Sequence, residues 1–318
     1  MARSPDVTRT EQPAPRRAGR AAAALLAVAF AGATAPMSAD AQSGARPGQR
    51  VAVVTGSTSG LGQELAMRLA AMGMHVVVHG RDEARGMEVV RAIEVAGGTA
   101  RFFRADFGSF AQTRAFGEAV LRDYDRLDLL VNNAGFGRAP DERMVSEDGL
   151  EFRIQVNHLS HFMLTRMWLP LLRASAPARI VNVASGAQQP IDFDDVMLER
   201  TTAPGGRFDG GRAYAQSKLA QIMFTIDLAE ELAGTGIEVN ALHPATFMDT
   251  RMVERAGIEP QSTVGEGADA VMHLITAPDL GSGGYFNQTR SARANAQAYD
   301  VEARRRLREL SEELTGVR

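Results

Sequence analysis

Apolar residues in this chain fall into two alternating kinds of segment, short continuous runs and longer mixed stretches. The short runs at 51–54, 75–78, 100–104, 127–131, 179–183, 237–242 and 284–286 predict β-strands. The longer stretches at 61–72, 83–95, 109–122, 151–173 and 212–232 predict helices between the strands. Continuous apolar strands separated by helices are typical of a parallel sheet covered on both faces. The pattern therefore predicts an α/β, doubly wound parallel sheet in a single domain, with ligands beyond the carboxyl ends of the strands.

The first 41 residues do not follow this pattern. Five arginines in residues 1–20 precede an alanine-rich apolar run at 21–35, and Ala39-Asp40-Ala41 follows. This order is typical of a secretory signal peptide, and the run is shorter than the ~20 residues that span a bilayer. We expect residues 1–41 to be a signal peptide for export to the periplasm, 42–49 a linker and 50–318 the folded domain. The alternative is an unprocessed extension on a cytoplasmic protein.

Composition excludes several kinds of site. The chain has no cysteine, which excludes disulfides, zinc–thiolate sites, iron–sulfur clusters and cysteine nucleophiles. The net charge of -3 provides no basic surface for nucleic acid. His158 and His161 have a spacing that occurs in metal sites, but no further ligand residues accompany them, so we expect no metal site. Lys218 is the single lysine among 35 basic residues.

A glycine-rich turn follows the first predicted strand, and a predicted helix begins inside it. Glycine lets the backbone turn tightly and approach a pyrophosphate. The helix N-terminus adds free N–H groups and a partial positive charge. The turn is therefore the candidate dinucleotide-binding loop, and its residues are Gly56, Ser57, Thr58, Ser59, Gly60, Leu61 and Gly62.

The end of the second predicted strand bears on which dinucleotide binds. It reads Val78-His79-Gly80-Arg81, without the acid that generally holds the ribose 2′-hydroxyl in NAD enzymes. The Arg81 guanidinium suits a 2′-phosphate, through charge-assisted bidentate hydrogen bonds. The sequence thus favours NADP over NAD. The alternatives for Asp82 are an inward contact with the ribose, which would suit NAD, and a cap on the next helix, which we favour.

Tyr214 and Lys218 lie four residues apart in a predicted helix, a spacing that places both side chains on one face. A tyrosine has a pKa of ~10 and must become about three units more acidic to exchange a proton near neutral pH. A neighbouring ammonium favours the phenolate, and the positive charge of an oxidised nicotinamide acts in the same direction. The pair is therefore a candidate site of proton transfer.

The glycine spacing G-x-x-x-G-x-G behind Thr55, together with the Y-x-x-x-K spacing, resembles the compact branch of the short-chain dehydrogenase/reductase family. The resemblance extends over residues 50–316 and implies a Rossmann fold with hydride transfer between a nicotinamide and a carbonyl or alcohol. It implies that Ser185 polarises the substrate oxygen and that Asn157 holds a relay water beside Lys218. The cofactor contacts it implies are Asp106 with Phe107 at the adenine, and Asn132, Ala134, Gly135, Tyr214, Lys218, Pro244 and Thr246.

The chain departs from the family pattern in two places. Ala245 replaces the usual glycine after Pro244, which leaves open whether Thr246 or Thr250 meets the nicotinamide carboxamide. Ser185 and Tyr214 are also separated by an insertion that includes 191–195 and 204–211. A loop beside the chemistry usually shapes the substrate pocket, so we expect the insertion to do so.

Several segments look most like the retinol dehydrogenase and WW-domain oxidoreductase branch of the family. These are residues 157–172, the insertion and the C-terminal tail, and they imply an apolar carbonyl or alcohol as substrate. The family also implies a homo-oligomer formed through the helices that carry Asn157 and Tyr214. Two other functions stay open: a sugar-nucleotide epimerase or dehydratase, which shares the Tyr–Lys pair, and a non-catalytic cofactor-sensing module.

Overall fold

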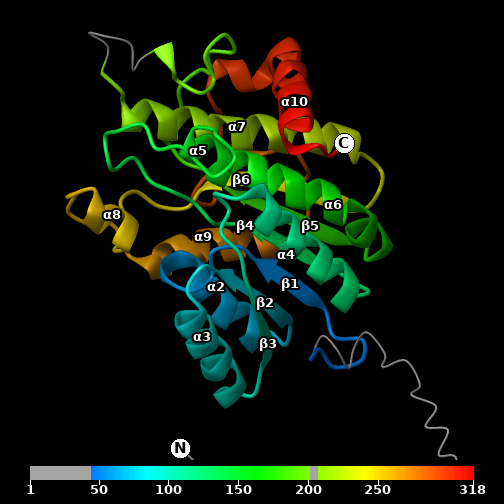
Figure 1. Cartoon of the computed structure of the whole chain (residues 1–318). Helices are drawn as coiled ribbons and strands as arrows, with labels where there is room; N and C mark the ends of the chain where they lie inside the picture. The colour runs from blue at the N-terminus through cyan, green and yellow to red at the C-terminus, as the bar shows by residue number, and fades with distance from the viewer. Residues whose placement is uncertain (1–43, 201–206) are drawn as a thin grey trace, which may run out of the picture. The chain divides into compact units, whose positions relative to one another are not determined.

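Eight strands form one sheet in the computed structural model, which describes residues 44–200 and 207–318 (Figure 1). The spatial order is β3-β2-β1-β4-β5-β6-β7-β8, and every neighbouring pair is parallel except β7 with β8. The strands are β1 Val51–Val54, β2 His75–Gly80, β3 Thr99–Arg104, β4 Leu129–Asn132, β5 Ala178–Val183, β6 Ile237–His243, β7 Tyr285–Asn287 and β8 Arg290–Ala292. The predicted doubly wound α/β sheet is confirmed. The antiparallel edge strand β8 was not predicted, so the sheet is mixed rather than wholly parallel.

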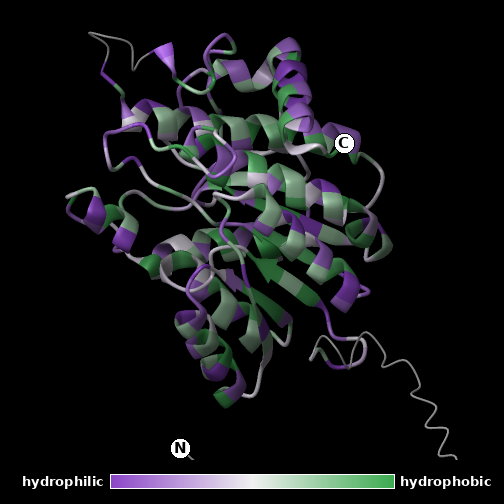
Figure 2. Cartoon of the chain, viewed as in Figure 1, coloured by the Kyte–Doolittle hydropathy of each residue, from purple (hydrophilic) through white to green (hydrophobic). Residues whose placement is uncertain are grey.

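Helices cover both faces of the sheet, as the strand pattern requires. One face carries α2 Gly60–Ala71, α3 Glu83–Val95 and α9 Val264–Thr276, and the other α4 Phe110–Asp123, α6 Ser160–Ala174 and α7 Gly210–Glu231. Strand β1 shows why both are needed. Its Val51 and Val53 pack toward α4, α6 and α7, whereas Ala52 and Val54 pack toward α2, α3 and α9. Strand β1 is accordingly apolar and buried along its whole length (Figure 2), whereas strands farther from the centre, such as β3, carry arginines.

The predicted helix 151–173 is interrupted. A short α5, Phe152–Ile154, passes into a π-helical turn, η1 Gln155–Leu159, before α6 begins. A π-turn inserts one residue into the helical repeat and often marks a functional site. Here the turn contains Asn157, so the interruption lies at one of the predicted catalytic residues.

Four further elements in the C-terminal part were not predicted. They are α8 Arg251–Arg255, α9, the 3₁₀ turn η3 Ala296–Tyr299 and α10 Val301–Thr315. Helix α9 begins with a capping box in which Thr263 and Glu266 each accept a backbone N–H of the other. Helix α10 is capped at its N-terminus by Asp300, whose carboxylate accepts two backbone N–H groups. At its C-terminus it is followed by Gly316 in the left-handed conformation.

Helix α10 packs on α7, on the side that faces away from the sheet. Arg308 forms an ion pair with Asp227 at 2.9 Å, and the buried Arg304 forms one with Glu230 at 2.7 Å. Helix α7 is therefore held between the sheet and the C-terminal helix. Assembly through α6 and α7 stays a prediction.

The expected signal peptide at 1–41, and with it the expected export, lies outside the described residues, as does the start of the expected linker. Among residues 44–200 and 207–318, no helix combines the length and the apolar character needed to cross a bilayer.

Candidate active site

The glycine-rich loop is packed so closely that side chains are excluded at two positions. Gly56 has a φ of +65°, and a Cβ there would lie 2.8 Å from the Cα of Ala134. A Cβ on Gly62 would overlap the carbonyl oxygen of Gly56. Ser59, the residue before α2, makes no side-chain cap, so no side chain there occupies the first-turn N–H groups. This cradle with its uncapped helix start fits the pyrophosphate of a dinucleotide.

Thr55 ties the loop to the segment that follows β4. Its hydroxyl accepts the backbone N–H groups of Asn133 and Ala134, both at 2.9 Å. The Asn133 amide donates back to the Thr55 carbonyl at 2.9 Å. The Thr55 hydroxyl also meets His161 Nε2 at 2.9 Å. Asn133 and His161 therefore support the loop, and His161 had been considered only as half of a possible metal-binding pair.

His161 acts here as a neutral linker. Its Nδ1 lies 2.9 Å from the Asn157 carbonyl oxygen, which can only accept, so Nδ1 carries the hydrogen and Nε2 accepts from Thr55. Burial lowers the pKa of His161 to about 3, which keeps the ring uncharged. The same ring thus connects the glycine loop to the π-turn that carries Asn157.

Asn132 is turned away from the site. Its amide is fully buried and donates to Thr165 at 3.2 Å and to Asn182 at 2.8 Å. Any cofactor contact by Asn132 would therefore come from its backbone. The side chain of the next residue, Asn133, is the one that holds the loop.

The four residues at the end of β2 and just beyond it, 79–82, are held in different ways. His79 points inward, where its Nδ1 accepts the Gly56 N–H at 3.1 Å and burial lowers its pKa to about 3. A Cβ on Gly80 would lie 2.5 Å from Cγ2 of Thr58, which excludes a side chain at that position. Asp82 caps α3 by accepting the Arg85 N–H, as we favoured.

Arg81 is the charged residue at the end of β2 whose side chain neither faces the core nor caps a helix. Its side chain is 59% exposed, and its guanidinium lies 3.2 Å from a carboxylate oxygen of Asp106. The other Asp106 oxygen accepts the Gly108 N–H at 2.9 Å. Phe107 is buried and stacks on the His79 ring at 4.3 Å, so its side chain belongs to the core beneath the expected adenine site.

Ser185 and Tyr214 come together across the end of β5, although 28 residues lie between them. The Ser185 side chain lies beside the buried Tyr214 phenol and acts to lower its pKa. The Ser185 carbonyl is held in turn by the Tyr285 hydroxyl of β7 at 3.0 Å. Tyr285 is thus a further residue that fixes this turn, and it had no sequence signal because its partner comes from a distant strand.

Lys218 lies on the same helix as Tyr214 and is buried. Its Nζ donates to the Val183 carbonyl oxygen and to Gln221 Oε1, both at 2.8 Å, and lies 5.8 Å from the centre of the Tyr214 ring. Burial lowers the pKa of Lys218 to about 7.

The electrostatics of Tyr214 differ from the sequence-based expectation. Burial raises the pKa of Tyr214, and the Ser185 side chain opposes this rise only in part. Lys218, whose Nζ lies 5.8 Å from the centre of the Tyr214 ring, is not among the groups that shift the pKa of Tyr214. The phenol is therefore protonated near neutral pH.

Asn157 clamps two parts of the site. Its amide donates to the Phe136 carbonyl at 3.1 Å and to the Ser217 hydroxyl at 2.8 Å, and its Oδ1 accepts the Phe136 N–H at 2.7 Å. A Cβ on Gly135 would lie 3.5 Å from Asn157 Oδ1 and 3.7 Å from Lys218 Nζ. Asn157 and Lys218 therefore face the same small space above Gly135.

The segment after β6 places its two threonines differently. The Thr246 hydroxyl lies 3.1 Å from Nε2 of His243, the residue that precedes Pro244. Thr250 lies over the glycine loop, since a Cβ on Gly60 would come within 3.3 Å of its methyl group. The structure thus brings Thr250 to the expected cofactor loop and holds Thr246 beside His243.

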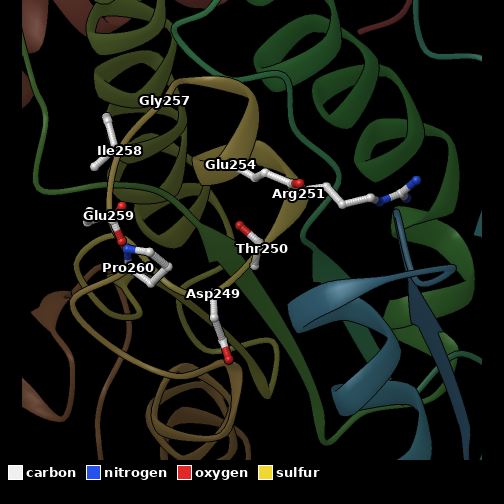
Figure 3. A pocket seen from close by; sticks show the side chains of 8 residues that line it. All are labelled: Asp249, Thr250, Arg251, Glu254, Gly257, Ile258, Glu259 and Pro260. Carbon is white, nitrogen blue, oxygen red and sulfur yellow. The ribbon is translucent and has the colours of Figure 1, made fainter.

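A cavity of about 550 Å³ opens beside this segment (Figure 3). In the figure Arg251 extends out of α8, away from the other lining side chains, and it donates to the Ser59 hydroxyl at 2.8 Å. Helix α8 is therefore fastened directly to the dinucleotide loop. The residues that line the cavity are Asp249, Thr250, Arg251, Glu254, Gly257, Ile258, Glu259 and Pro260.

The loop after β4 is held by a buried ion pair. Arg153 and Glu151 are both fully buried and lie 3.2 Å apart. Arg153 also donates to the carbonyl oxygens of Gly137 and Arg138 at 3.0 Å each. The pair therefore supports the backbone next to Phe136 and Asn157.

The first part of the insertion is packed against the C-terminal region. Ile191 is buried, and the Gln297 amide pairs with both its N–H, at 2.7 Å, and its carbonyl, at 3.0 Å. Residues 201–206, which include the start of the second part, lie outside the described residues. The role of the insertion in shaping a substrate pocket stays a prediction.

No group of three or more potential metal ligands occurs in the parts of the chain that the structure describes. His158, the other histidine of the considered pair, is buried, and its Nε2 lies 2.8 Å from the Ser311 hydroxyl of α10.

Comparison with known proteins supports one family. The family model described as short chain dehydrogenase matches residues 50–192 and 202–260. Retinol dehydrogenase 13 of Mus musculus is 34% identical over 292 residues, covering 85% of this chain and 85% of the relative. Retinol dehydrogenase 12 of Homo sapiens is 34% identical over 284 residues, covering 85% and 87%.

Solved structures agree. A putative uncharacterized protein from Mycobacterium paratuberculosis has a TM-score of 0.69 at 28% identity, covering 85% of this chain and 94% of its own. The RhlG/NADP complex of Pseudomonas aeruginosa has a TM-score of 0.59 at 30% identity, covering 75% and 94%. These matches do not favour the sugar-nucleotide enzyme or the cofactor-sensing module.

Proposed function

The chain belongs to the short-chain dehydrogenase family and is an NAD(P)-dependent oxidoreductase, and on this premise we propose that it uses NADP(H) to interconvert a carbonyl and an alcohol, with Tyr214 as the proton carrier. The observation that carries the proposal is the Ser185 side chain beside the Tyr214 phenol, with the buried Lys218 on the same helix as Tyr214. When bound, the nicotinamide supplies or accepts the hydride. The pyrophosphate would be held by the glycine loop and the start of α2.

The protonation states support carbonyl reduction. Tyr214 is protonated near neutral pH because burial raises its pKa, so it can donate to the oxygen of a carbonyl. Ser185 would donate a second hydrogen bond to the same oxygen and stabilise the charge that develops there. Lys218, with a pKa of about 7, and Asn157 face one space and would return the proton to Tyr214 through water.

The preference for NADP rests on the end of β2. His79 faces the core, Gly80 has no room for a side chain and Asp82 is used as a helix cap, so Arg81 is the charged group left for the ribose. A guanidinium suits a 2′-phosphate. The RhlG relative carries NADP in its solved complex, which supports the same choice.

The proposed substrate class is an apolar carbonyl or alcohol. The support is the similarity to proteins named retinol dehydrogenases, which covers 85% of this chain. Fold alone carries little information about substrate, so the class is tested by a panel of aliphatic to polycyclic aldehydes and ketones with NADPH and NADH.

Tyr214→Phe tests the proton carrier. General acid catalysis contributes about 10²–10⁴-fold, so kcat for NADPH-dependent carbonyl reduction should fall by at least about a hundredfold. NADPH binding, measured by fluorescence titration, should stay within about twofold of wild type, because the glycine loop is untouched. Tyr299→Phe is the matched control, since Tyr299 lies in η3, is 40% exposed and its hydroxyl accepts the Ala294 N–H, so the same change removes a tyrosine hydroxyl away from Tyr214. An active Tyr214→Phe enzyme would show that the assignment is wrong.

Arg81→Ala tests the cofactor preference. Loss of a charge-assisted contact of about 1.5–3 kcal/mol should raise the dissociation constant for NADPH by about tenfold or more and leave that for NADH unchanged. Arg85→Ala is the control, because Arg85 is the neighbouring arginine and is paired with Asp82. Equal losses for NADPH and NADH in Arg81→Ala would contradict a contact with the 2′-phosphate.

A further inference from the structure

Lys218 is the only lysine of the chain, and its environment is unusual for an ammonium group. The residue is 3% exposed, and its Nζ has two acceptors, the Val183 carbonyl and the Gln221 side chain, each at 2.8 Å. An ammonium has three N–H groups, so these acceptors leave one for other partners. The titratable groups facing it are Tyr214 on the same helix and the neutral His161 on α6.

Gln221 makes one side-chain hydrogen bond among the described residues, and that bond is to Lys218. Its side chain is buried, and its Nε2 has no partner there. The amide orientation is fixed, because only the oxygen can accept from an ammonium. A buried amide with an unpaired N–H₂ group costs stability. The one hydrogen bond that this buried side chain makes in spite of that cost is the bond to Lys218.

We propose that Gln221 is a positioning residue: together with the Val183 carbonyl, it fixes the Lys218 ammonium so that the remaining N–H faces the space above Gly135. This inference rests on the proposed function, because that space is where the nicotinamide ribose and the relay water would lie. The Asn157 side chain faces the same space.

Both acceptors also stabilise the charged form of the lysine. A hydrogen bond to the charged form of a group favours that form, whereas burial disfavours it. Burial lowers the pKa of Lys218 to about 7, so a change in one acceptor moves its titration through the physiological range. Replacing the Gln221 oxygen should therefore change the charge of Lys218 as well as its orientation.

Helix α7 offers a matched control in Gln216. This residue is also a buried glutamine, and its amide likewise makes one hydrogen bond, from Nε2 to the Val196 carbonyl at 2.8 Å. Its Oε1 has no partner among the described residues. Gln216→Leu thus removes a comparable buried amide without touching Lys218.

The test uses the single lysine as a spectroscopic probe. Protein labelled with ¹³Cε-lysine gives one lysine Cε signal, whose shift with pH reports the charge of Lys218 without any turnover. Gln221→Leu should move the titration midpoint down by about one pH unit, because one acceptor of the charged form is lost. Gln221→Glu should move it up by about one unit or more, because a carboxylate faces the ammonium. Gln216→Leu should titrate like wild type.

The same variants are then assayed for NADPH-dependent carbonyl reduction as a function of pH. The limb of the kcat profile that depends on Lys218 should move in the direction of the NMR midpoint. Titration of Gln221→Leu and Gln216→Leu at the wild-type midpoint would overturn the proposal. If Gln221→Leu does not fold, Gln221→Glu decides, with Gln216→Glu as its control. General disruption that exposes Lys218 would raise the midpoint in both variants, because burial is what lowers it, whereas a carboxylate facing the ammonium raises it in Gln221→Glu only. Shifted midpoints in a protein without turnover would refute the proposed function but retain the role of Gln221 toward Lys218.

Discussion

Acidification should destabilise this protein sharply, because four of its histidines are buried in uncharged form. Burial lowers the pKa of His75 to about 4 and the pKa values of His79, His158 and His161 to about 3. In the unfolded chain a histidine has a pKa of about 6.5. As the pH falls, protons therefore bind to the histidines of the unfolded chain before those of the folded protein. The free energy of unfolding is highest above pH 6.5 and decreases as the pH falls toward the pKa values of the folded state.

The size of the effect follows from the same values. At pH 5.0 each of the four histidines lowers the free energy of unfolding by about 2 kcal/mol, or by about 8 kcal/mol in total. Domains typically have about 5–15 kcal/mol of stability, so most of it should be gone at this pH. The limiting slope is about 1.4 kcal/mol per pH unit for each histidine, or about 5 kcal/mol per unit for all four.

Urea unfolding at pH 7.5, 6.0, 5.5 and 5.0 measures this slope. His158→Gln should reduce it by about a quarter, whatever it does to the absolute stability. A free energy of unfolding that changes by less than about 1.4 kcal/mol between pH 6.0 and 5.0, the value for one proton, would refute the reasoning.

Two substitutions test other parts of the site. Gly62→Ala should weaken NADPH binding by about tenfold or more, seen by fluorescence titration, because the new Cβ overlaps a carbonyl oxygen of the loop; unchanged affinity would contradict the close packing. Arg153→Met should lower the free energy of unfolding in urea by about 3–5 kcal/mol, because it leaves the Glu151 carboxylate buried without its partner. Adding Glu151→Gln to Arg153→Met should recover part of the loss, and a purely additive double variant would contradict a coupled pair.

The sequence was sufficient for the features that are local in the chain. The apolar runs of the strands, the glycine loop and the four-residue spacing of Tyr214 and Lys218 each depend on a few neighbouring residues. The cap formed by Asp82 is local in the same sense. These features predicted the α/β sheet, which the structure confirms, and the place of the dinucleotide loop and of the Tyr214–Lys218 pair, which stays a prediction.

The features that the sequence did not predict depend on contacts between distant segments. Hydrophobic periodicity does not reveal one extra residue in a helical repeat, so the π-turn at Asn157 was missed. The orientation of Asn132 toward the core and of Asn133 toward the loop depends on partners in α6, in β5 and in the residue that follows β1. The rise in the pKa of Tyr214 comes from burial, which a sequence does not show.

The burial of the one lysine has a practical consequence. Amine-reactive reagents find no lysine on the folded surface, so apart from the α-amino group they can modify this protein only at Lys218, in molecules that have opened. The extent of amine labelling over time would therefore count opening events around the centre of the proposed chemistry, and bound nucleotide should slow it.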